Sequence, residues 1–130
     1  MRIVGTGIDI VEIARIAKSY EKYQLKFAEQ ILHEEELSGF EGAKNKAAFL
    51  AKRFAVKEAF AKAMGTGIRD DVHWHAMYVQ HDEKGKPSLA FTTEFAKKIQ
   101  ADRLDVHISI SDEKKYVVAQ ALIVENTSES

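Results

Sequence analysis

The segment from residue 47 to residue 64 is the feature that most constrains the fold. It is rich in Ala, Leu, Lys and Glu, which are strong helix formers. Gly65 follows at the position where a glycine commonly ends a helix. Glu58 and Lys62 project from one side of this helix. The opposite side is apolar, so we expect the rest of the chain to pack around it; it carries Phe49, Val56, Phe60, Ala63 and Met64.

The remaining segments predict strands at both ends of the chain. Residues 2–10 read as a buried strand on which Gly5, Gly7 and Asp9 share one face, with room for a ligand or for close packing of another element. Residues 12–27 follow with helical periodicity, placing Tyr23 and Phe27 on a core stripe. The second half predicts strands at 72–80, 87–92, 105–111 and 116–124, and a short helix at 93–102 with a threonine cap.

This order of elements predicts an α+β fold in which an antiparallel sheet packs against a long central helix. We expect a single domain over residues 1–124 and a polar tail over residues 125–130. The chain has 130 residues, of which 45% are hydrophobic and 30% charged, as in ordinary globular domains.

Composition excludes several classes of function. The 19 basic and 20 acidic side chains nearly cancel, so the chain lacks the global positive field of a general nucleic-acid binder. There is no cysteine, which excludes disulfide scaffolds, thiolate zinc sites and cysteine nucleophiles. The first residues do not resemble a signal peptide, and no segment is long and apolar enough to span a membrane. By elimination we expect a cytoplasmic protein.

Asp9 and Glu58 are the first candidate site. Each carboxylate lies on a regular element and points away from its apolar neighbours. Two converging carboxylates are the usual protein contribution to a Mg²⁺ site that phosphate oxygens complete. Spacing alone does not show convergence, and solvated surface carboxylates are the more common outcome. Lys62 lies four residues after Glu58, as a surface salt bridge or as a cation for phosphate.

Two further patterns admit a functional and a plain interpretation. His107, Ser109 and Ser111 alternate onto one strand face, which suits phosphate binding or proton transfer but also a solvated face. Residues 65–67, Gly-Thr-Gly at a helix end, could offer backbone N–H groups to phosphate, although the pattern lacks a complete nucleotide fingerprint. We interpret the histidines as solvated: His33 on a helix surface, and His73, His75 and His81 without a metal.

A basic stripe follows the first helical segment. Its members recur every three or four residues and so share one helix face, with Leu25 exposed beside them: Arg15, Lys18, Lys22 and Lys26. The default interpretation is a solvated face. The alternative is a docking surface for an acidic protein, since complementary charge speeds encounter and sets orientation.

Together these segments resemble a known family. Residues 5–13, 49–68, 85–87 and 107–111 are closely similar to bacterial holo-[acyl-carrier-protein] synthases, the short class of 4'-phosphopantetheinyl transferases. The resemblance covers nearly the whole chain in order and implies that fold. It implies transfer of phosphopantetheine from coenzyme A to a serine of apo-acyl carrier protein, for fatty acid biosynthesis. The other product would be adenosine 3',5'-bisphosphate.

The resemblance also implies roles for individual residues. Asp9 and Glu58 would hold Mg²⁺ on the pyrophosphate of coenzyme A, and the catalytic set would be Glu58, Lys62 and His107. The base that takes the serine proton could be Glu58, directly or through a metal-bound water, or Lys62. The coenzyme A pocket would be lined by Lys62, Gly65, Thr66, Gly67, Pro87, His107, Ser109 and, less specifically, Ser111.

The same resemblance implies partners. Carrier proteins are acidic and would dock on Arg15, Lys22, Lys26 and Phe27, to which the helical-face argument adds Lys18. A helix break near Gln24 would reconcile an accessible Phe27 with the core stripe. The family is usually a homotrimer with active sites between subunits.

Two departures from the family pattern concern charge. The stripe carries mostly Lys where relatives often carry Arg, and Asp112 stands where a histidine is common. Two other functions remain open at this stage: a non-catalytic module that binds an acidic protein, and another coenzyme A enzyme such as an acyltransferase.

Overall fold

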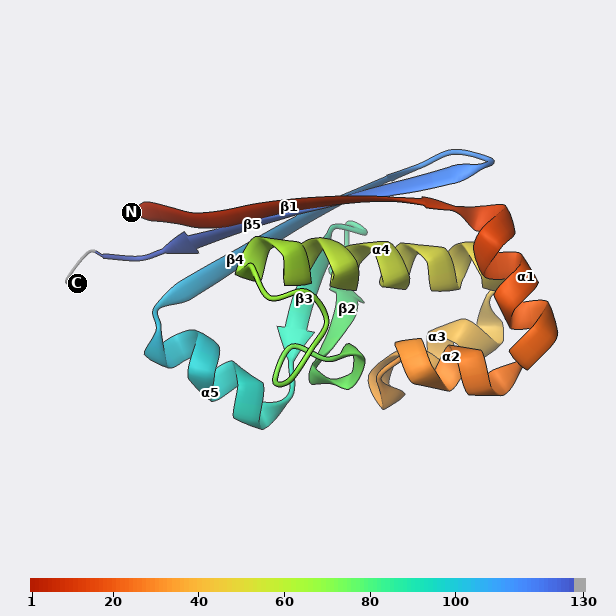
Figure 1. Cartoon of the computed structure of the whole chain (residues 1–130), viewed down its shortest axis with the longest axis horizontal. Coiled ribbons are helices and arrows are strands. Elements are labelled where there is room, and N and C mark those ends of the chain that lie inside the picture. Colours follow the sequence, from red (N-terminus) through yellow and green to blue (C-terminus); the bar gives the residue numbers. More distant parts are fainter. Residues whose placement is uncertain (128–130) are drawn as a thin grey trace.

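One long helix lies against a three-stranded sheet (Figure 1). The structure is a computed structural model that describes residues 1–127. Helix α4 (Lys46–Met64) crosses the sheet formed by β1 (Arg2–Glu12), β5 (Tyr116–Glu125) and β4 (Leu104–Asp112). The strand order is β1-β5-β4 and both pairs are antiparallel. The predicted α+β architecture with a long central helix is therefore confirmed.

The other elements surround α4. Strands β2 (Met77–His81) and β3 (Pro87–Phe91) form a separate antiparallel hairpin. Helices α1 (Ile13–Tyr23), α2 (Leu25–Ile31) and α3 (Glu34–Gly42) gather at one end of the molecule, and α5 (Thr93–Ala101) lies at the other (Figure 1). No helix in the part of the chain that the structure describes is long and apolar enough to cross a membrane.

Helix α4 approaches β1 unusually closely because the facing residues are small. A Cβ atom added to Gly7 would overlap the carbonyl oxygen of Ala59, and one added to Gly5 would overlap that of Ala63. On β5, the partners that share this face with the glycines are also small or apolar: Ala119, Ala121 and Ile123. The two glycines of the first strand thus serve close packing of another element, which was one of the two interpretations of the sequence.

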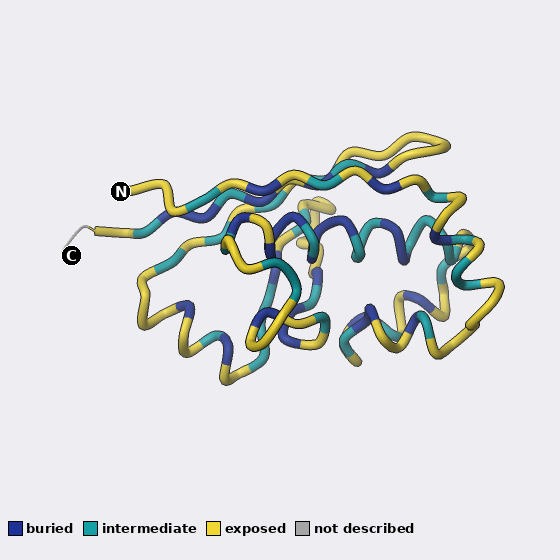
Figure 2. The backbone as a smooth tube through the Cα atoms, viewed as in Figure 1, coloured by how far each residue is buried: buried dark blue, intermediate teal, exposed yellow. Residues whose placement is uncertain are grey.

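The prediction that residues 2–10 form a buried strand is correct for one face only. Ile3, Ile8 and Ile10 are more than 60% exposed, and Figure 2 shows exposed positions along the whole of β1. The reason is that α4 covers only one face of the three-stranded sheet. The outer face, which carries these isoleucines, is covered by no element among residues 1–127.

The helix predicted over residues 12–27 is interrupted. Gln24 has φ 53° and ψ −134°, a conformation that non-glycine residues rarely adopt, and it separates α1 from α2. The break is where the resemblance required it, and it leaves Phe27 half-buried against the core. The placement of Tyr23 on the core stripe is wrong, because this side chain sits at the end of α1 and is 53% exposed.

Two local predictions need correction. Residues 72–76 are not part of a strand, since Val72 forms an isolated bridge with Arg69 and residues 74–76 form a single turn of 3-10 helix. Helix α3 was indicated only by the interpretation of His33 as a helix-surface residue, and its bounds were not predicted. His33 is the N-cap residue that precedes Glu34. Its Nδ1 accepts the N–H of Glu35 while Glu36 accepts the N–H of His33, so His33 caps a helix instead of lying on its solvated surface.

The remaining boundaries agree closely with the sequence. The short helix α5 is preceded by Thr92 rather than capped by a threonine side chain, because no side-chain cap bond is formed there. Strand β5 runs to Glu125, the residue at which the sequence predicts the polar tail to begin. Residues 128–130 of that tail lie outside the described residues.

The close approach of α4 to β1 predicts a large difference between two glycine substitutions. Gly7→Ala should lower the free energy of unfolding by about 1–3 kcal/mol, because its Cβ has no room beside the α4 backbone. Gly42→Ala is the matched control, since open space surrounds that Cβ at the end of α3. Urea unfolding of both variants measures the difference, and equal midpoints would contradict this account of the packing.

Candidate functional site

Asp9 and Lys62 meet where β1 passes beside α4. The Lys62 ammonium donates hydrogen bonds to Asp9 Oδ1 at 3.0 Å and to the carbonyl oxygen of Ile8 at 3.0 Å. The Asp9 side chain is 16% exposed and the Lys62 side chain 51% exposed. Lys62 therefore forms its ion pair across two elements, and the simple salt bridge to Glu58 along one helix is not what the structure contains.

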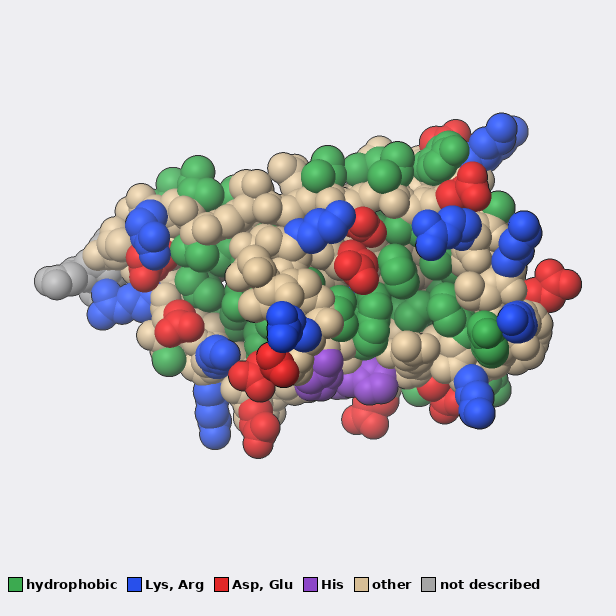
Figure 3. Space-filling model, in the orientation of Figure 1, with side chains coloured by type: hydrophobic (Ala, Val, Ile, Leu, Met, Phe, Trp, Pro, Cys, Tyr) green, Lys and Arg blue, Asp and Glu red, His purple; other side chains and the backbone are tan. Residues whose placement is uncertain are grey.

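Glu58 completes a cluster of charges with this pair. Burial raises the pKa of the Glu58 carboxyl, the negative charge of Asp9 raises it further, and the Lys62 ammonium opposes both in part. The two carboxylates predicted as a site are thus close enough to repel each other. Figure 3 shows acidic and basic side chains side by side in the middle of this face, over β1 and α4.

One oxygen of the cluster has no partner. Asp9 Oδ2 is buried and forms no hydrogen bond. A buried carboxylate oxygen beside a second carboxylate is an environment that favours a cation. Among residues 1–127 no group of three or more His, Cys, Asp or Glu side chains could hold a metal ion, so the protein offers two carboxylates here. That number fits Mg²⁺, which commonly binds one or two carboxylates and keeps positions for phosphate and water.

The turn after α4 does not offer its backbone donors to a ligand. Gly65 and Gly67 have φ of 80° and 69°, values that favour glycine, and they close the helix. The N–H of Gly65 donates to Lys62, and those of Thr66 and Gly67 both donate to Ala61. The interpretation of these N–H groups as a phosphate cradle is therefore wrong. Any contact of this turn with a ligand must use other atoms.

The alternation predicted for the fourth strand is present. His107, Ser109 and Ser111 are exposed on the outer face of the sheet, while Val106, Ile108 and Ile110 pack toward the core; His107 pairs with Leu122 of β5. Asp9 lies on the inner face, toward α4. Within one chain the His107 group and the Asp9 cluster therefore lie on opposite faces of the same sheet.

Pro87 occupies a third place. It starts β3 opposite His81, whose pKa is lowered by burial and then by the positive charges of Arg53 and Lys52. The hairpin thus lies beside residues 52 and 53 of α4, about 18 Å along the helix axis from Gly65 at 1.5 Å per residue. The predicted coenzyme A residues do not converge within one chain.

Asp112, at the end of β4, has a partner on α4. Lys52 Nζ lies 3.6 Å from Asp112 Oδ2, and both side chains are partly exposed. The negative charge whose effect the sequence left open is thus opposed by a neighbouring ammonium. The ion pair also connects the end of β4 to α4.

The basic stripe continues across the helix break. Arg15, Lys18 and Lys22 are exposed on α1 and Lys26 is exposed on α2. Figure 3 shows basic side chains at the end of the molecule that α1 and α2 form. The break also exposes two apolar side chains among these cations, Tyr23 at 53% and Leu25 at 58%, and the exposure of Leu25 was predicted. The surface combines positive charge with apolar contact area.

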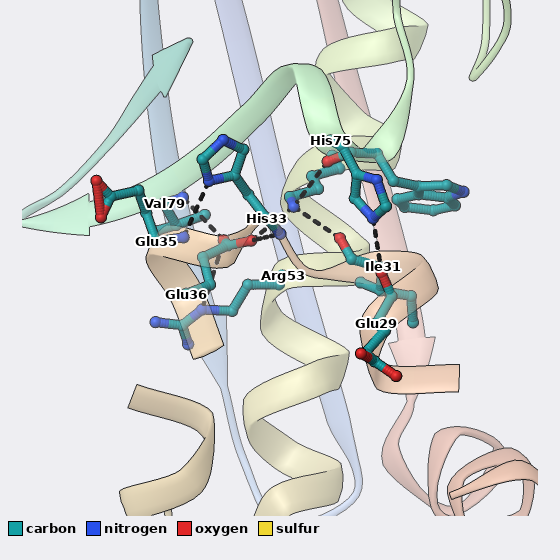
Figure 4. A network of polar contacts seen from close by, with 10 residues as sticks. Glu29, Ile31, His33, Glu35, Glu36, Arg53, His75 and Val79 are labelled. Atoms are coloured by element: carbon teal, nitrogen blue, oxygen red, sulfur yellow. Dashed lines mark hydrogen bonds and ion pairs between the residues drawn. The ribbon is translucent and has the colours of Figure 1, made fainter. Parts of the chain in front are cut away.

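Sequence reasoning missed a buried ion pair beside the site. Lys57, which precedes Glu58, is fully buried, and its Nζ lies 2.7 Å from Glu36 Oε1 (Figure 4). Burial lowers the pKa of Lys57 and the Glu36 carboxylate opposes that change. Position 57 falls among buried positions of α4, which was the available signal, but its partner lies on α3, whose bounds were not predicted.

Comparison with known proteins identifies relatives of similar length. The model of the 4'-phosphopantetheinyl transferase superfamily matches residues 5–121. A holo-[acyl-carrier-protein] synthase of Aromatoleum aromaticum is 46% identical over 121 residues, which cover 93% of this chain and 97% of that protein. One from Vibrio cholerae is 43% identical over 124 residues, with the same coverage of both chains.

Solved structures agree with these matches. The crystal structure of a holo-[acyl-carrier-protein] synthase from Neisseria meningitidis superposes with a TM-score of 0.90 at 40% identity, covering 95% of this chain and 99% of that one. A synthase from Bacillus anthracis, in complex with CoA (3',5'-ADP), has a TM-score of 0.83 at 40% identity, with 97% and 100% covered.

The charge cluster predicts a coupled titration. In the metal-free protein, Asp9→Asn should lower the pKa of Glu58, because it removes a negative charge that raises it. When folding raises the pKa of a carboxyl, the free energy of unfolding of the protein falls as the pH rises through that pKa. This fall should be smaller in Asp9→Asn than in the unsubstituted chain. Carbon-13 NMR titration of the side-chain carboxyls in EDTA measures the shift. Asp105→Asn, an exposed carboxylate on β4, is the control; an unchanged or higher Glu58 pKa in Asp9→Asn would contradict the geometry.

Proposed function

The chain belongs to the 4'-phosphopantetheinyl transferase superfamily, and we propose that it transfers 4'-phosphopantetheine from coenzyme A to apo-acyl carrier protein. The serine oxygen forms a bond to the phosphorus that carries pantetheine, and the bond from that phosphorus to the bridging pyrophosphate oxygen breaks. Adenosine 3',5'-bisphosphate leaves and the serine proton is released. The observation that carries the proposal is the Asp9, Glu58 and Lys62 cluster within a chain that matches the superfamily over most of its length.

We propose that Asp9 and Glu58 hold Mg²⁺. The unpartnered Asp9 Oδ2 and the raised pKa of Glu58 support this assignment. When bound, Mg²⁺ supplies positive charge to the pyrophosphate and to the leaving oxygen. Lys62 contributes a second positive charge at a half-exposed position, where a phosphate oxygen can reach it.

The contacts of Lys62 bear on the choice of base. The Lys62 amine nitrogen donates hydrogen bonds to Asp9 Oδ1 and to the Ile8 carbonyl oxygen, contacts that suit a cation held beside a carboxylate. The Glu58 carboxylate can accept a proton. We therefore assign the serine proton to Glu58 and the role of a phosphate-binding cation to Lys62.

We propose that the carrier protein docks on the basic stripe of Arg15, Lys18, Lys22 and Lys26, with Phe27 beneath it. Exposed cations that follow α1 and α2 support this, since they attract and orient an acidic partner. The place in fatty acid biosynthesis and the cytoplasmic location remain predictions from the sequence.

We propose that the coenzyme A pocket forms between copies of the chain, as a homotrimer would provide. His107 and Ser109 share the outer face of the sheet with the exposed Ile8 and Ile10. Apolar side chains gain free energy when a second copy buries them, and such packing would place His107 against a neighbour. It would also account for the separation of His107 and Pro87 from the Asp9 cluster within one chain.

Intact-mass spectrometry tests the proposed reaction. Apo-acyl carrier protein incubated with the chain, coenzyme A and Mg²⁺ should gain the mass of one phosphopantetheine group, and EDTA should prevent the gain. Asp9→Ala and Glu58→Ala should each abolish transfer while the fold survives, and Asp105→Ala should not affect it. If a competent carrier gains no mass, the transferase assignment is wrong, and salt-sensitive carrier binding that ignores Asp9 would instead favour a binding module. Acyl transfer without pyrophosphate cleavage would favour an acyltransferase.

Subunit mixing tests the shared pocket. Glu58→Ala and His107→Ala should each be inactive alone, because each lacks one half of every site. Co-expressed in one oligomer, they should regain part of the transfer activity, since some interfaces then combine an intact Glu58 with an intact His107. No recovery in an oligomer shown by mass spectrometry to contain both variants would place the complete site within one chain.

A further inference from the structure

The C-terminal end of α2 is held by two side chains from other elements. The last carbonyl groups of a helix have no partner within it. The Ile31 carbonyl accepts a hydrogen bond from Lys57 Nζ at 2.7 Å, and the Glu29 carbonyl accepts one from the Nε2–H of His75 at 2.6 Å. Figure 4 shows both contacts arriving at the same end of α2. Lys57 belongs to α4 and His75 to the turn of 3-10 helix before β2.

Lys57 forms hydrogen bonds to residues of several elements. Its buried ammonium donates to Ile31, to Glu36 Oε1 at 2.7 Å and to the Trp74 carbonyl at 3.0 Å, so all three of its N–H groups are used. Glu36 in turn accepts the backbone N–H groups of His33 and Val79, at 2.9 Å each. The pair therefore links α4 to α2, α3, β2 and the 3-10 turn through satisfied hydrogen bonds (Figure 4).

The Lys57–Glu36 ion pair lies directly beside the cluster of Asp9, Glu58 and Lys62. Lys57 and Glu58 are consecutive on α4, so a contact that fixes the direction of the Lys57 side chain also fixes the rotation of the helix that aims Glu58. Helix α2, whose end Lys57 holds, carries Lys26 and Phe27 of the proposed docking surface. The buried Lys57 ammonium thus connects α2, on which the protein substrate would dock, to α4 at the position next to Glu58, which would accept the proton.

We propose that Lys57 and His75 are positioning residues that hold α2 in register with Glu58, so that a protein docked on α2 presents its hydroxyl group to the site. The inference rests on the proposed function and extends it to residues outside the charge cluster. It concerns the protein substrate alone, because α2 contacts neither Asp9 nor Lys62 through any hydrogen bond or ion pair within residues 1–127. Displacement of a reacting group by an ångström lowers rates steeply, which is why such a link matters.

His75 provides the cleaner test because its side chain is exposed and its removal buries no charge. His75→Ala should lower kcat/KM for the carrier protein about three- to tenfold, the scale of one net hydrogen bond. The KM for coenzyme A should be unchanged. His75→Gln should restore carrier turnover, since its amide N–H can donate to Glu29. His73→Ala is the matched control, an exposed neighbouring histidine whose side chain forms no hydrogen bond or ion pair with α2 among residues 1–127.

The Lys57 link is tested with both charges removed. Lys57→Met alone would remove the ammonium that lies 2.7 Å from the buried Glu36 carboxyl, which destabilises proteins strongly, so the Lys57→Met, Glu36→Gln double variant is used. It should lower carrier turnover more than His75→Ala and keep its affinity for coenzyme A. If it does not fold, the His75 series decides.

The outcomes separate the inference from the function on which it rests. Absence of transfer by the unsubstituted chain would overturn both. Transfer by that chain, with carrier kcat/KM unchanged in His75→Ala, would overturn the inference alone. An equal loss for carrier and coenzyme A, not restored by His75→Gln, would show a merely structural role and would also overturn it.

Discussion

The contact between α4 and the glycine face of β1 is the constraint on which the site depends. Without side chains at Gly5 and Gly7, the helix backbone lies directly on the strand. Asp9, the next residue on the same face, is then brought beside Glu58 and Lys62, one helical turn apart on α4. A larger residue at either glycine would move the helix away and separate the charges. Packing and chemistry are therefore set by the same pair of residues.

That contact brings together two carboxylates whose negative charge Lys62 balances only in part. Asp9 and Glu58 repel each other, one buried oxygen has no donor, and Lys62 supplies a single positive charge. A metal ion bound with a pyrophosphate would balance such a site. On the opposite face of the sheet, exposed isoleucine side chains have no apolar partner that covers them among residues 1–127. The proposed metal ion and the proposed second copy of the chain would supply these missing contacts.

Much of the fold could be predicted because its strongest elements have local signals. Helical spacing identified α4, strand alternation identified β4, and the conflict over Phe27 indicated the break at Gln24. The exposed face of β1 could not be predicted, because periodicity does not say which faces of a sheet are covered. Neither could the pairing of Lys57 with Glu36, since it joins residues on separate helices through burial. The engaged N–H groups of the Gly65 turn likewise follow from three-dimensional capping geometry.

Calorimetric titration of coenzyme A into the chain, with Mg²⁺ and then with EDTA, tests the central claim most directly. If Asp9 and Glu58 bind a metal together with the pyrophosphate, Mg²⁺ should increase the affinity for coenzyme A by about tenfold or more, a difference of about 1.4 kcal/mol or more. The same comparison in Asp9→Asn should show little or no increase. Equal affinity with Mg²⁺ and with EDTA in the unsubstituted chain would contradict the role assigned to the two carboxylates.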